Sequence, residues 1–189
     1  MAIEKIMVAH GDMETRGGLK ALGVYEFGDI SNLSFDTDGN HKISSLTDPS
    51  DGGALFELKQ GTGSLSSTGT KEGGTILFEH TVTAYIPKLS DAHLSAIDAL
   101  SDKNLIVMCL DYNDVTYAVG LSQKFHLGVA TDAHNQMYAR LSSVELSTGA
   151  ALGDETGATL TFTCQSGELP YIVDPAVTID TAAGTFAIG

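Results

Sequence analysis

The chain has 189 residues, a length that favours a single domain, and 42% of its residues are apolar, which is enough for a buried core. Ten Lys and Arg against 24 Asp and Glu give a formal charge of −14. This charge argues against direct binding to DNA or to an anionic membrane, because phosphate contacts need a basic surface. An acidic surface is typical either of ordinary solubility or of a wall past which nucleic acid slides without sticking.

The composition also predicts where the protein is made and how it folds. No basic and apolar leader opens the chain, and no apolar run is long enough for a membrane helix. Cys109 and Cys164 lie in the apolar runs VMCLD and TFTCQ, which predicts buried, reduced thiols in a protein made in a cytosol. Abundant Gly (21) and scarce Pro (4) suit an all-β protein with many turns.

The first strands are expected between residues 19 and 60. An apolar stretch ends at Gly28-Asp29, and LSFDTDGNHKISSL then predicts a hairpin that turns at Asp38-Gly39. ALFELKQ is strand-like. The stretch Gly61–Thr75 is rich in Gly, Ser and Thr, and we interpret it as a loop of 15 residues, which is long for a compact domain.

TILFEHTVTAYIP is the clearest strand, with apolar residues at spacing two that only His80 interrupts. Pro87 ends it. A helix follows, with Ser90 as N-cap, and Leu94, Ile97 and Leu100 are expected to form its buried stripe. Leu89 is expected to pair with Leu94 as a hydrophobic staple.

The second half of the chain predicts two further pairs of strands. NLIVMCL and VTYAVGL flank the turn DYND, and ARLSSVELS and ATLTFTCQS each show a face of Ser and Thr. After Gly167 the pattern has no clear period, and we interpret it as an extended arm. We therefore expect an N-terminal segment (1–16), a β-rich domain with one helix (17–166) and a C-terminal arm (167–189).

No motif for catalysis, cofactor binding or metal binding is legible, and we expect no enzyme. The six histidines have no metal-ligand spacing with one another or with the cysteines. FDTDGNHKI resembles the start of a calcium loop, but His41 and Thr47 occupy the positions of its Gly and Glu. GTGSLS matches neither phosphate-loop spacing, and GxSxG and HExxH are absent. His80 is expected to be a hydrogen-bonded core or interface histidine.

The remaining features point to self-assembly. A long strand whose two faces both need partners suggests a sheet that continues across a subunit boundary. A homo-oligomer that closes a ring would use such strands, and stacked rings would use the long loop and the arm.

Three segments carry a resemblance to phage and prophage tail tube (major tail) proteins. These are GSLSSTGTKEGGTILFEHTVTAYIPKLS with the helix after it, LIVMCLDYNDVTYAVG, and TLTFTCQSGELPYIV, together with the early GGLKALGVYEFGDI. The resemblance covers most of residues 17–172. It is one of pattern, without a catalytic signature, and residues 174–189 extend beyond it.

The resemblance implies a β-sandwich or barrel with one flanking α-helix that covers the outward face of its sheet. It also implies rings of six subunits whose inner sheets form a continuous β-barrel, and rings that stack into a conduit for DNA ejection. The protein would be a virion component made in the host bacterial cytoplasm. Its partners would be further copies of itself and the tape measure, baseplate and terminator proteins, and DNA would pass the acidic lumen without specific binding.

Within this interpretation, the stacking loop is placed at residues 62–74 and the ring-forming strand at residues 75–86. Lys71 and Glu72 are the charged residues expected to meet a neighbouring ring. The candidate interface residues from the loop and the strand are Thr62, Gly63, Ser64, Lys71, Glu72, Gly73, Phe78, His80 and Val82.

Two other classes remain open at this point. The first is another virion component, namely a capsid decoration protein, a head–tail connector or a tail terminator ring. The second is a ligand-binding β-sandwich, which the absence of Trp and the 7% aromatic content disfavour.

Overall fold

The computed structural model describes residues 17–29, 31–36, 41–47, 53–123, 137–149, 155–174, 179–181 and 184–186. These residues form a mainly β fold with two large sheets and one α-helix, which confirms the predicted fold class. The predicted N-terminal segment (1–16) lies outside the described residues.

The larger sheet has seven strands in the order β2-β3-β11-β8-β7-β1-β4. Its strands are β1 (Leu19–Glu26), β2 (Ser31–Phe35), β3 (Lys42–Thr47), β4 (Ala54–Glu57), β7 (Leu105–Asp111), β8 (Thr116–Val119) and β11 (Tyr171–Val173). The predicted β2–β3 and β7–β8 hairpins are confirmed, although the turn at Asp38-Gly39 lies outside the described residues. Every pair in this sheet is antiparallel except β11 with β3.

The smaller sheet has four antiparallel strands in the order β5-β6-β10-β9. They are β5 (Ser64–Glu72), β6 (Thr75–Pro87), β9 (Arg140–Ser147) and β10 (Gly157–Ser166). A separate two-stranded sheet joins β12 (Ile179–Thr181) to β13 (Gly184–Phe186).

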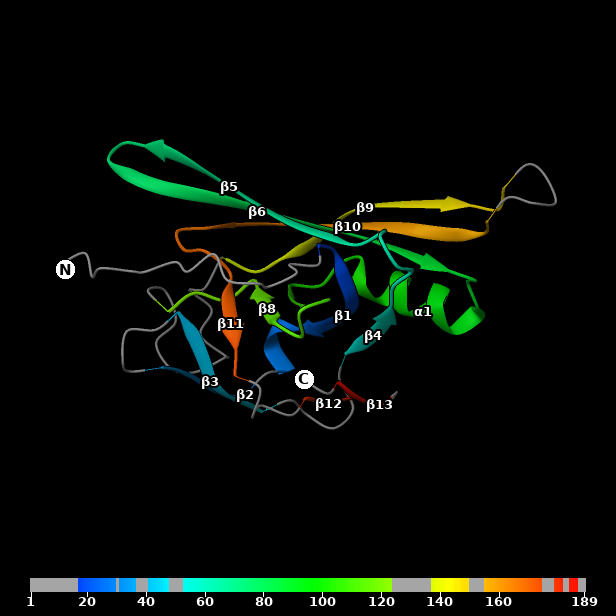
Figure 1. The fold of residues 1–189 in the computed structure, drawn as a ribbon, viewed down its shortest axis with the longest axis horizontal. Coiled ribbons are helices and arrows are strands. Elements are labelled where there is room, and N and C mark those ends of the chain that lie inside the picture. Colours follow the sequence, from blue (N-terminus) through cyan, green and yellow to red (C-terminus); the bar gives the residue numbers. More distant parts are fainter. Residues whose placement is uncertain are drawn as a thin grey trace, which may run out of the picture.

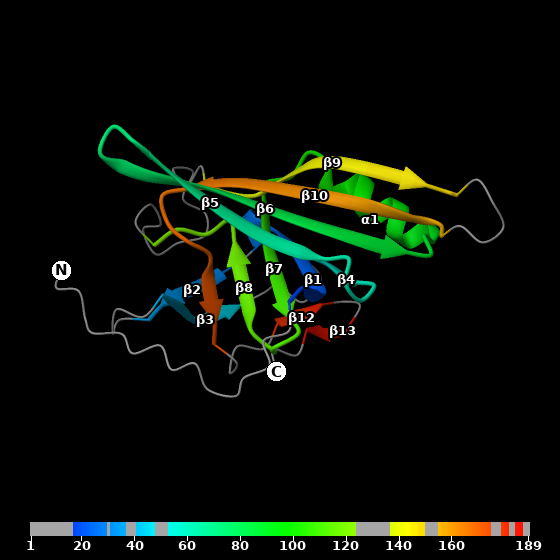
Figure 2. The same cartoon turned by 45° about the horizontal axis from the view of Figure 1, so that its top comes forward.

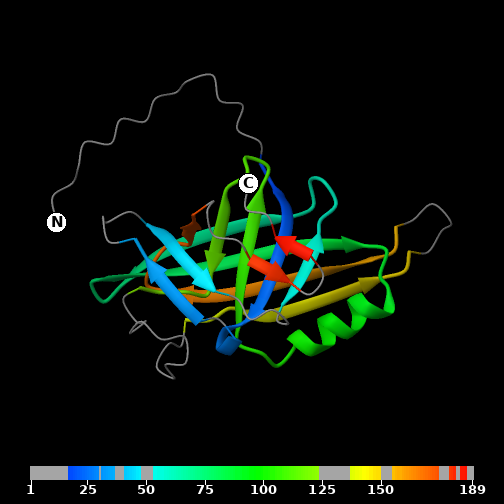
Figure 3. The same cartoon turned by 90° about the horizontal axis from the view of Figure 1, so that it is seen from below.

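The two large sheets pack face to face as a sandwich, with the four-stranded sheet above the seven-stranded one (Figure 1). Seen from below, the strands of one layer run across those of the other (Figure 3), which is the orthogonal form of sheet packing. The core between the layers combines β1 and β7 with the inward residues of β6 and β10, such as Ala84 and Leu160. No closed barrel is present in the part of the chain that the structure describes.

The centre of the seven-stranded sheet is buried on both faces. Val107 of β7 points into the core between the layers, and its neighbours Ile106 and Met108 join a second core cluster with Tyr25, Ile43 and Tyr171. This explains why NLIVMCL is a continuous apolar run without alternation, since a strand covered on both sides has no wet face.

Helix α1 (Asp91–Leu100) begins where the sequence predicts, at the N-cap Ser90. Ser90 and His93 cap each other, because the N–H of each donates to the side chain of the other, at 3.3 Å in both cases. The predicted stripe is confirmed for Ile97 and Leu100 but is wrong for Leu94, which is 45% exposed. Ile97 and Leu100 enter the core between the two sheets, so the helix closes one side of the sandwich instead of covering an outward face.

The predicted loop Gly61–Thr75 is also wrong, because most of it is strand. β5 pairs with β6 along its whole length, from Ser64 opposite Thr83 to Glu72 opposite Thr75. Gly73 and Gly74 form the two-residue turn between them with φ of 55° and 94°, which suits Gly in a tight hairpin. Figures 1 and 2 show the tip of this hairpin extending past the end of the lower sheet.

The predicted C-terminal arm is corrected at its start. Tyr171–Val173 form β11, which is inserted between β3 and β8, and Tyr171 and Val173 are buried in the second core cluster. Three residues are too few to show a periodic pattern, so the sequence carries no local signal for this strand.

Candidate assembly surface

Most side chains on the outer face of the four-stranded sheet carry hydroxyl groups, although Leu77 and Gln165 also lie on it. Residues directly opposite each other on neighbouring strands share a face, as in the row Ser66–Thr81–Thr163. We call this surface the hydroxyl face. Its hydroxyl residues are Ser64, Ser66, Thr68, Thr70, Thr81, Thr83, Tyr85, Ser143, Ser147, Thr159, Thr161 and Thr163.

Charge is sparse on the hydroxyl face. Glu79 and Glu145 stand in it, as does one cation, Arg140. The guanidinium of Arg140 lies 4.9 Å from the ring centroid of Tyr138 and donates to its hydroxyl at 2.8 Å. The cation is therefore held by its own chain, and the face as a whole is polar, flat and slightly acidic.

Both edges of the same sheet lack a partner strand. β5 pairs only with β6, and β9 pairs only with β10, among the residues that the structure describes. Each edge therefore presents backbone N–H and C=O groups that can pair with another chain. β5 has nine residues and β9 has eight, so the two edges are nearly equal in length.

The structure divides the predicted loop residues between the two ends of β5. Thr62 and Gly63 lie at the base, where the Gly63 carbonyl accepts from Leu19 N–H at 3.1 Å. A Cβ on Gly63 would lie 2.9 Å from Leu19 Cβ, which cannot move without its backbone, so Gly permits this close approach. Ser64 begins the strand.

Lys71, Glu72 and Gly73 lie at the far end of the same hairpin, where Lys71 is exposed. These three residues therefore lie at the projecting end of the β5–β6 hairpin.

The predicted residues of the ring strand point toward the protein's own interior. His80 and Val82 are buried, at 2% and 1% exposure, and Phe78 is half-buried near the overhanging end of β6. Their side chains lie on the inner face of the sheet, toward the seven-stranded layer.

His80 is hydrogen-bonded in the core, as the sequence predicts. Its Nε2 donates to the Glu168 carbonyl at 3.0 Å, which leaves Nδ1 to accept from the Ser67 hydroxyl at 2.9 Å. Burial lowers the pKa of His80, and the bond to the Glu168 carbonyl opposes this effect. The neutral imidazole therefore connects β5 to the segment that joins β10 to β11.

A polar network at this crossing was not predicted from the sequence. The Glu168 carboxylate accepts from the Ser122 hydroxyl and, at 2.9 Å, from the Tyr171 hydroxyl, which itself accepts from Gln123 N–H at 3.3 Å. The His41 ring stacks on Tyr171 at 3.8 Å. Burial and Glu168 together raise the pKa of Tyr171. The network fixes the path of the chain between the two layers.

The two thiols are free and buried, as predicted. Burial raises the pKa of Cys109, and it raises that of Cys164 to about 12, so neither is a reactive thiolate near neutral pH. The described residues contain no group of three or more His, Cys, Asp or Glu placed to hold a metal ion. Within the same residues, no helix combines the length and the apolarity that crossing a membrane requires.

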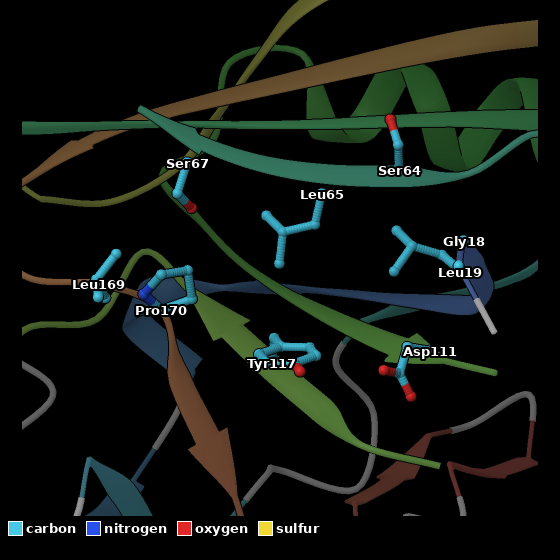
Figure 4. A pocket seen from close by; sticks show the side chains of 10 residues that line it. Gly18, Leu19, Ser64, Leu65, Ser67, Asp111, Tyr117, Leu169 and Pro170 are labelled. Atoms are coloured by element: carbon cyan, nitrogen blue, oxygen red, sulfur yellow. The ribbon is translucent and has the colours of Figure 1, made fainter. Parts of the chain in front are cut away.

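A cleft of about 480 Å³ opens beneath the free edge of β5, between the two layers. We call it the β5 cleft. Figure 4 shows Leu65 pointing down from β5 into it, facing Tyr117 and the corner at Leu169 and Pro170, with Leu19 at one end. Ser64 points away from the cleft, toward the hydroxyl face.

No protein-family model, curated protein or solved structure matches this chain. The fold defines the class of the protein as a two-layer β-sandwich with one α-helix. Its function has to be inferred from the surface just described.

Proposed function

We propose that this protein is a structural subunit of a tube of the phage tail type, in which copies join side by side into rings and the rings stack. The observation that carries the proposal is the four-stranded sheet, which is anchored to a core on one face, hydroxyl-lined on the other and free at both edges. This agrees with the resemblance found in the sequence.

The direction of the strands favours closure into a ring. β5 and β9 run in opposite directions, because they are the first and last of four antiparallel strands. Rotation about an axis along the strands preserves their directions. It therefore brings β9 of one copy against β5 of the next as an antiparallel pair, and the ring becomes one continuous antiparallel barrel without edges.

The width of such a barrel favours six copies over three. With four strands per copy, six copies supply about 24 strands. A strand spacing of about 4.8 Å and a tilt of about 40° then give a backbone diameter of about 45–50 Å. Three copies would give only about 25 Å by the same geometry. Once side chains line the wall, the wider barrel still admits duplex DNA and the narrower one does not.

The hydroxyl face suits the inner wall of a DNA conduit. Its one cation, Arg140, is engaged by Tyr138, so it presents few groups that could bind phosphates tightly. Glu79 and Glu145, with the overall charge of −14, add repulsion. DNA would pass this wall without specific binding, and the role of the protein would be structural and not catalytic.

The remaining partners belong to the same proposal. The overhanging β5–β6 hairpin is placed to reach a neighbouring ring. Tape measure, baseplate and terminator proteins would contact the lumen and the two ends of the tube. The protein would then reside in the virion.

Negative-stain electron microscopy of the concentrated protein, with light-scattering mass on the same sample, tests the proposal. Hollow tubes or stacked rings are the expected result. A single ring that does not stack would indicate a connector or terminator, and a trimer would indicate a decoration protein. A chain that stays monomeric even when mixed with tail ends would contradict the proposal.

Thiol labelling tests which face lines the tube. A maleimide–polyethylene glycol reagent should modify Thr161→Cys quickly in the monomer and slowly in tubes, while Ile172→Cys, on the other sheet, should react in both. The buried native thiols keep the background low. Equal labelling of Thr161→Cys in tubes would place the hydroxyl face outside.

A further inference from the structure

The β5 cleft has mainly apolar walls, and two of the polar side chains that line it, Asp111 and Ser67, are hydrogen-bonded within the chain. The Asp111 carboxylate accepts from Asn113 N–H at 2.8 Å and Val115 N–H at 2.9 Å, and Ser67 is bonded to His80. Leu65 and Leu169 present apolar side chains to the cleft, and Leu169 is 49% exposed. An apolar occupant therefore fits the cleft better than a charged or strongly polar ligand does.

The opposite edge of the sandwich carries unusual apolar exposure. Val144 and Leu146 on β9 are 44% and 55% exposed, although they pair with Leu160 and Ala158 and so lie on the apolar side of the sheet. Leu94, on α1, is exposed as well. Figures 1 and 3 agree that α1 runs beneath β9, so these side chains belong to one side of the molecule, away from β5.

The proposed ring brings these two sides together. If β9 pairs antiparallel with β5 of the next copy from Ser147 opposite Ser64, the bulge between Leu141 and Ser143 brings Arg140 opposite Thr70 of the neighbour. Ser147 then meets Ser64, Glu145 meets Ser66, and the hydroxyl face continues unbroken. A slip of one residue would place apolar side chains against hydroxyls, so only shifts of two residues compete. A shift that places Val144 opposite Leu65 shortens the paired segment, because the end of β9 then passes the start of β5.

We propose that in the ring the apolar side chains of Leu146, Val144 and Leu94 of one copy fill the β5 cleft of the next, with Leu146 directly opposite Leu65. The inference rests on the proposed function and adds to it the register of the joint and the occupant of the cleft. It explains why one side of the sandwich is closed by α1 while the other is left open. Burial of these side chains would supply the hydrophobic part of the joint.

Disulfide crosslinking tests the register. Within one copy, β6 and β10 separate Leu65 from Leu146, which places them too far apart for a disulfide. A disulfide between the two introduced cysteines of Leu65→Cys/Leu146→Cys must therefore join two copies, and directly opposite strand residues lie within disulfide reach. Oxidation of assembled protein should give a ladder of linked subunits on a denaturing gel.

Leu65→Cys/Val144→Cys is the matched control, because it reports the register shifted by two residues. It should crosslink far less, and each single variant should give no ladder. Assembly is recorded by microscopy before oxidation, so the two proposals can fail separately. Absence of rings would overturn both. Rings without the Leu65–Leu146 crosslink, or with the control crosslink equally strong, would overturn the register and leave the tube proposal standing.

A charge introduced on α1 tests whether Leu94 helps to fill the β5 cleft of the next copy. Leu94→Asp should fold normally, because the side chain is 45% exposed, and should greatly reduce ring formation. Ile172→Asp is the control, because this residue is 41% exposed on the other sheet. Thermal unfolding confirms that both variants fold. If Leu94→Asp assembles as well as Ile172→Asp, α1 takes no part in the joint.

Discussion

The two sheets of this protein differ in how many of their faces and edges are covered within one chain. The centre of the seven-stranded sheet is covered on both faces, and β7 is buried along nearly its whole length. The four-stranded sheet has one buried face, one hydroxyl face and two free edges. The comparison suggests a division of labour, in which the first sheet stabilises the monomer and the second is available for assembly.

The largest expected effect is on stacking. Replacing residues 69–78 with an Asn-Gly turn joins Thr68 to its partner Glu79, a pair of the same hydrogen-bonding type as Glu72 and Thr75, and removes the overhang without changing the register. We expect single rings that no longer form tubes, as seen by electron microscopy. Deleting the whole predicted loop would be less informative, because it would also remove the free edge strand.

The control for this change keeps the length of the hairpin. Gly73→Asn should be tolerated, since Asn accepts the positive φ of 55°, and tubes should still form. Tubes of normal length from the shortened protein would show that the hairpin does not stack the rings.

The next effect is on the stability of the two sheets. Ile106→Ala in β7 should lower the free energy of unfolding by about 2–5 kcal/mol, because it leaves a cavity in a fully buried strand. Ile76→Ala in β6 makes the same chemical change at a residue that is 48% exposed and should cost less than about 1 kcal/mol. Urea unfolding of the monomer measures both. Equal losses would contradict the division of labour.

A smaller loss is expected where the chain crosses between the layers. Tyr171→Phe removes the hydroxyl that joins Glu168 to Gln123 N–H and should cost about 1–3 kcal/mol, because partly buried polar groups lose a partner. Tyr117→Phe is the control, as it removes a half-buried hydroxyl at the β5 cleft, outside this network. A loss no greater than that of the control would show that the network contributes little.

The smallest effect is a pH dependence from His80. Its pKa is lower in the folded state, so the unfolded state binds the proton first as the pH falls. Stability should be at its full value above the unfolded pKa of about 6.5 and should decline as the pH falls from there toward the folded pKa. Urea midpoints at about pH 7.5 and pH 5.5, compared between the native chain and His80→Gln, measure this. An identical decline in both would assign it to other groups.

Several elements were predictable because their signals are local. The Ser90 cap, the alternation of β6 and the buried run of β7 each depend on residues a few positions apart. The burial of Cys109, Cys164 and His80 followed from the same patterns. The mainly β fold with one helix was therefore legible in the sequence.

The candidate site was only partly predictable. Lys71, Glu72 and Gly73 do lie at a projecting tip, but the sequence suggested a loop because Ser, Thr and Gly are common in linkers. In β5 the same residue types form the solvent-exposed face of a strand, and pairing with β6 holds this strand in place. The free edge β9, the β5 cleft and the exposure of Leu94 carried no sequence signal at all.

What the sequence by itself determined is the cap at which α1 begins, the alternation of β6 and the buried run of β7. Only the tertiary structure decided which strands pair, which edges stay free, and that Tyr171 and Glu168 meet Ser122 at the crossing of the layers. The physical reason is the separation along the chain of the residues that make each contact. Caps, turns and alternation are set by neighbours in the chain, whereas sheet order depends on contacts between segments that lie far apart in it.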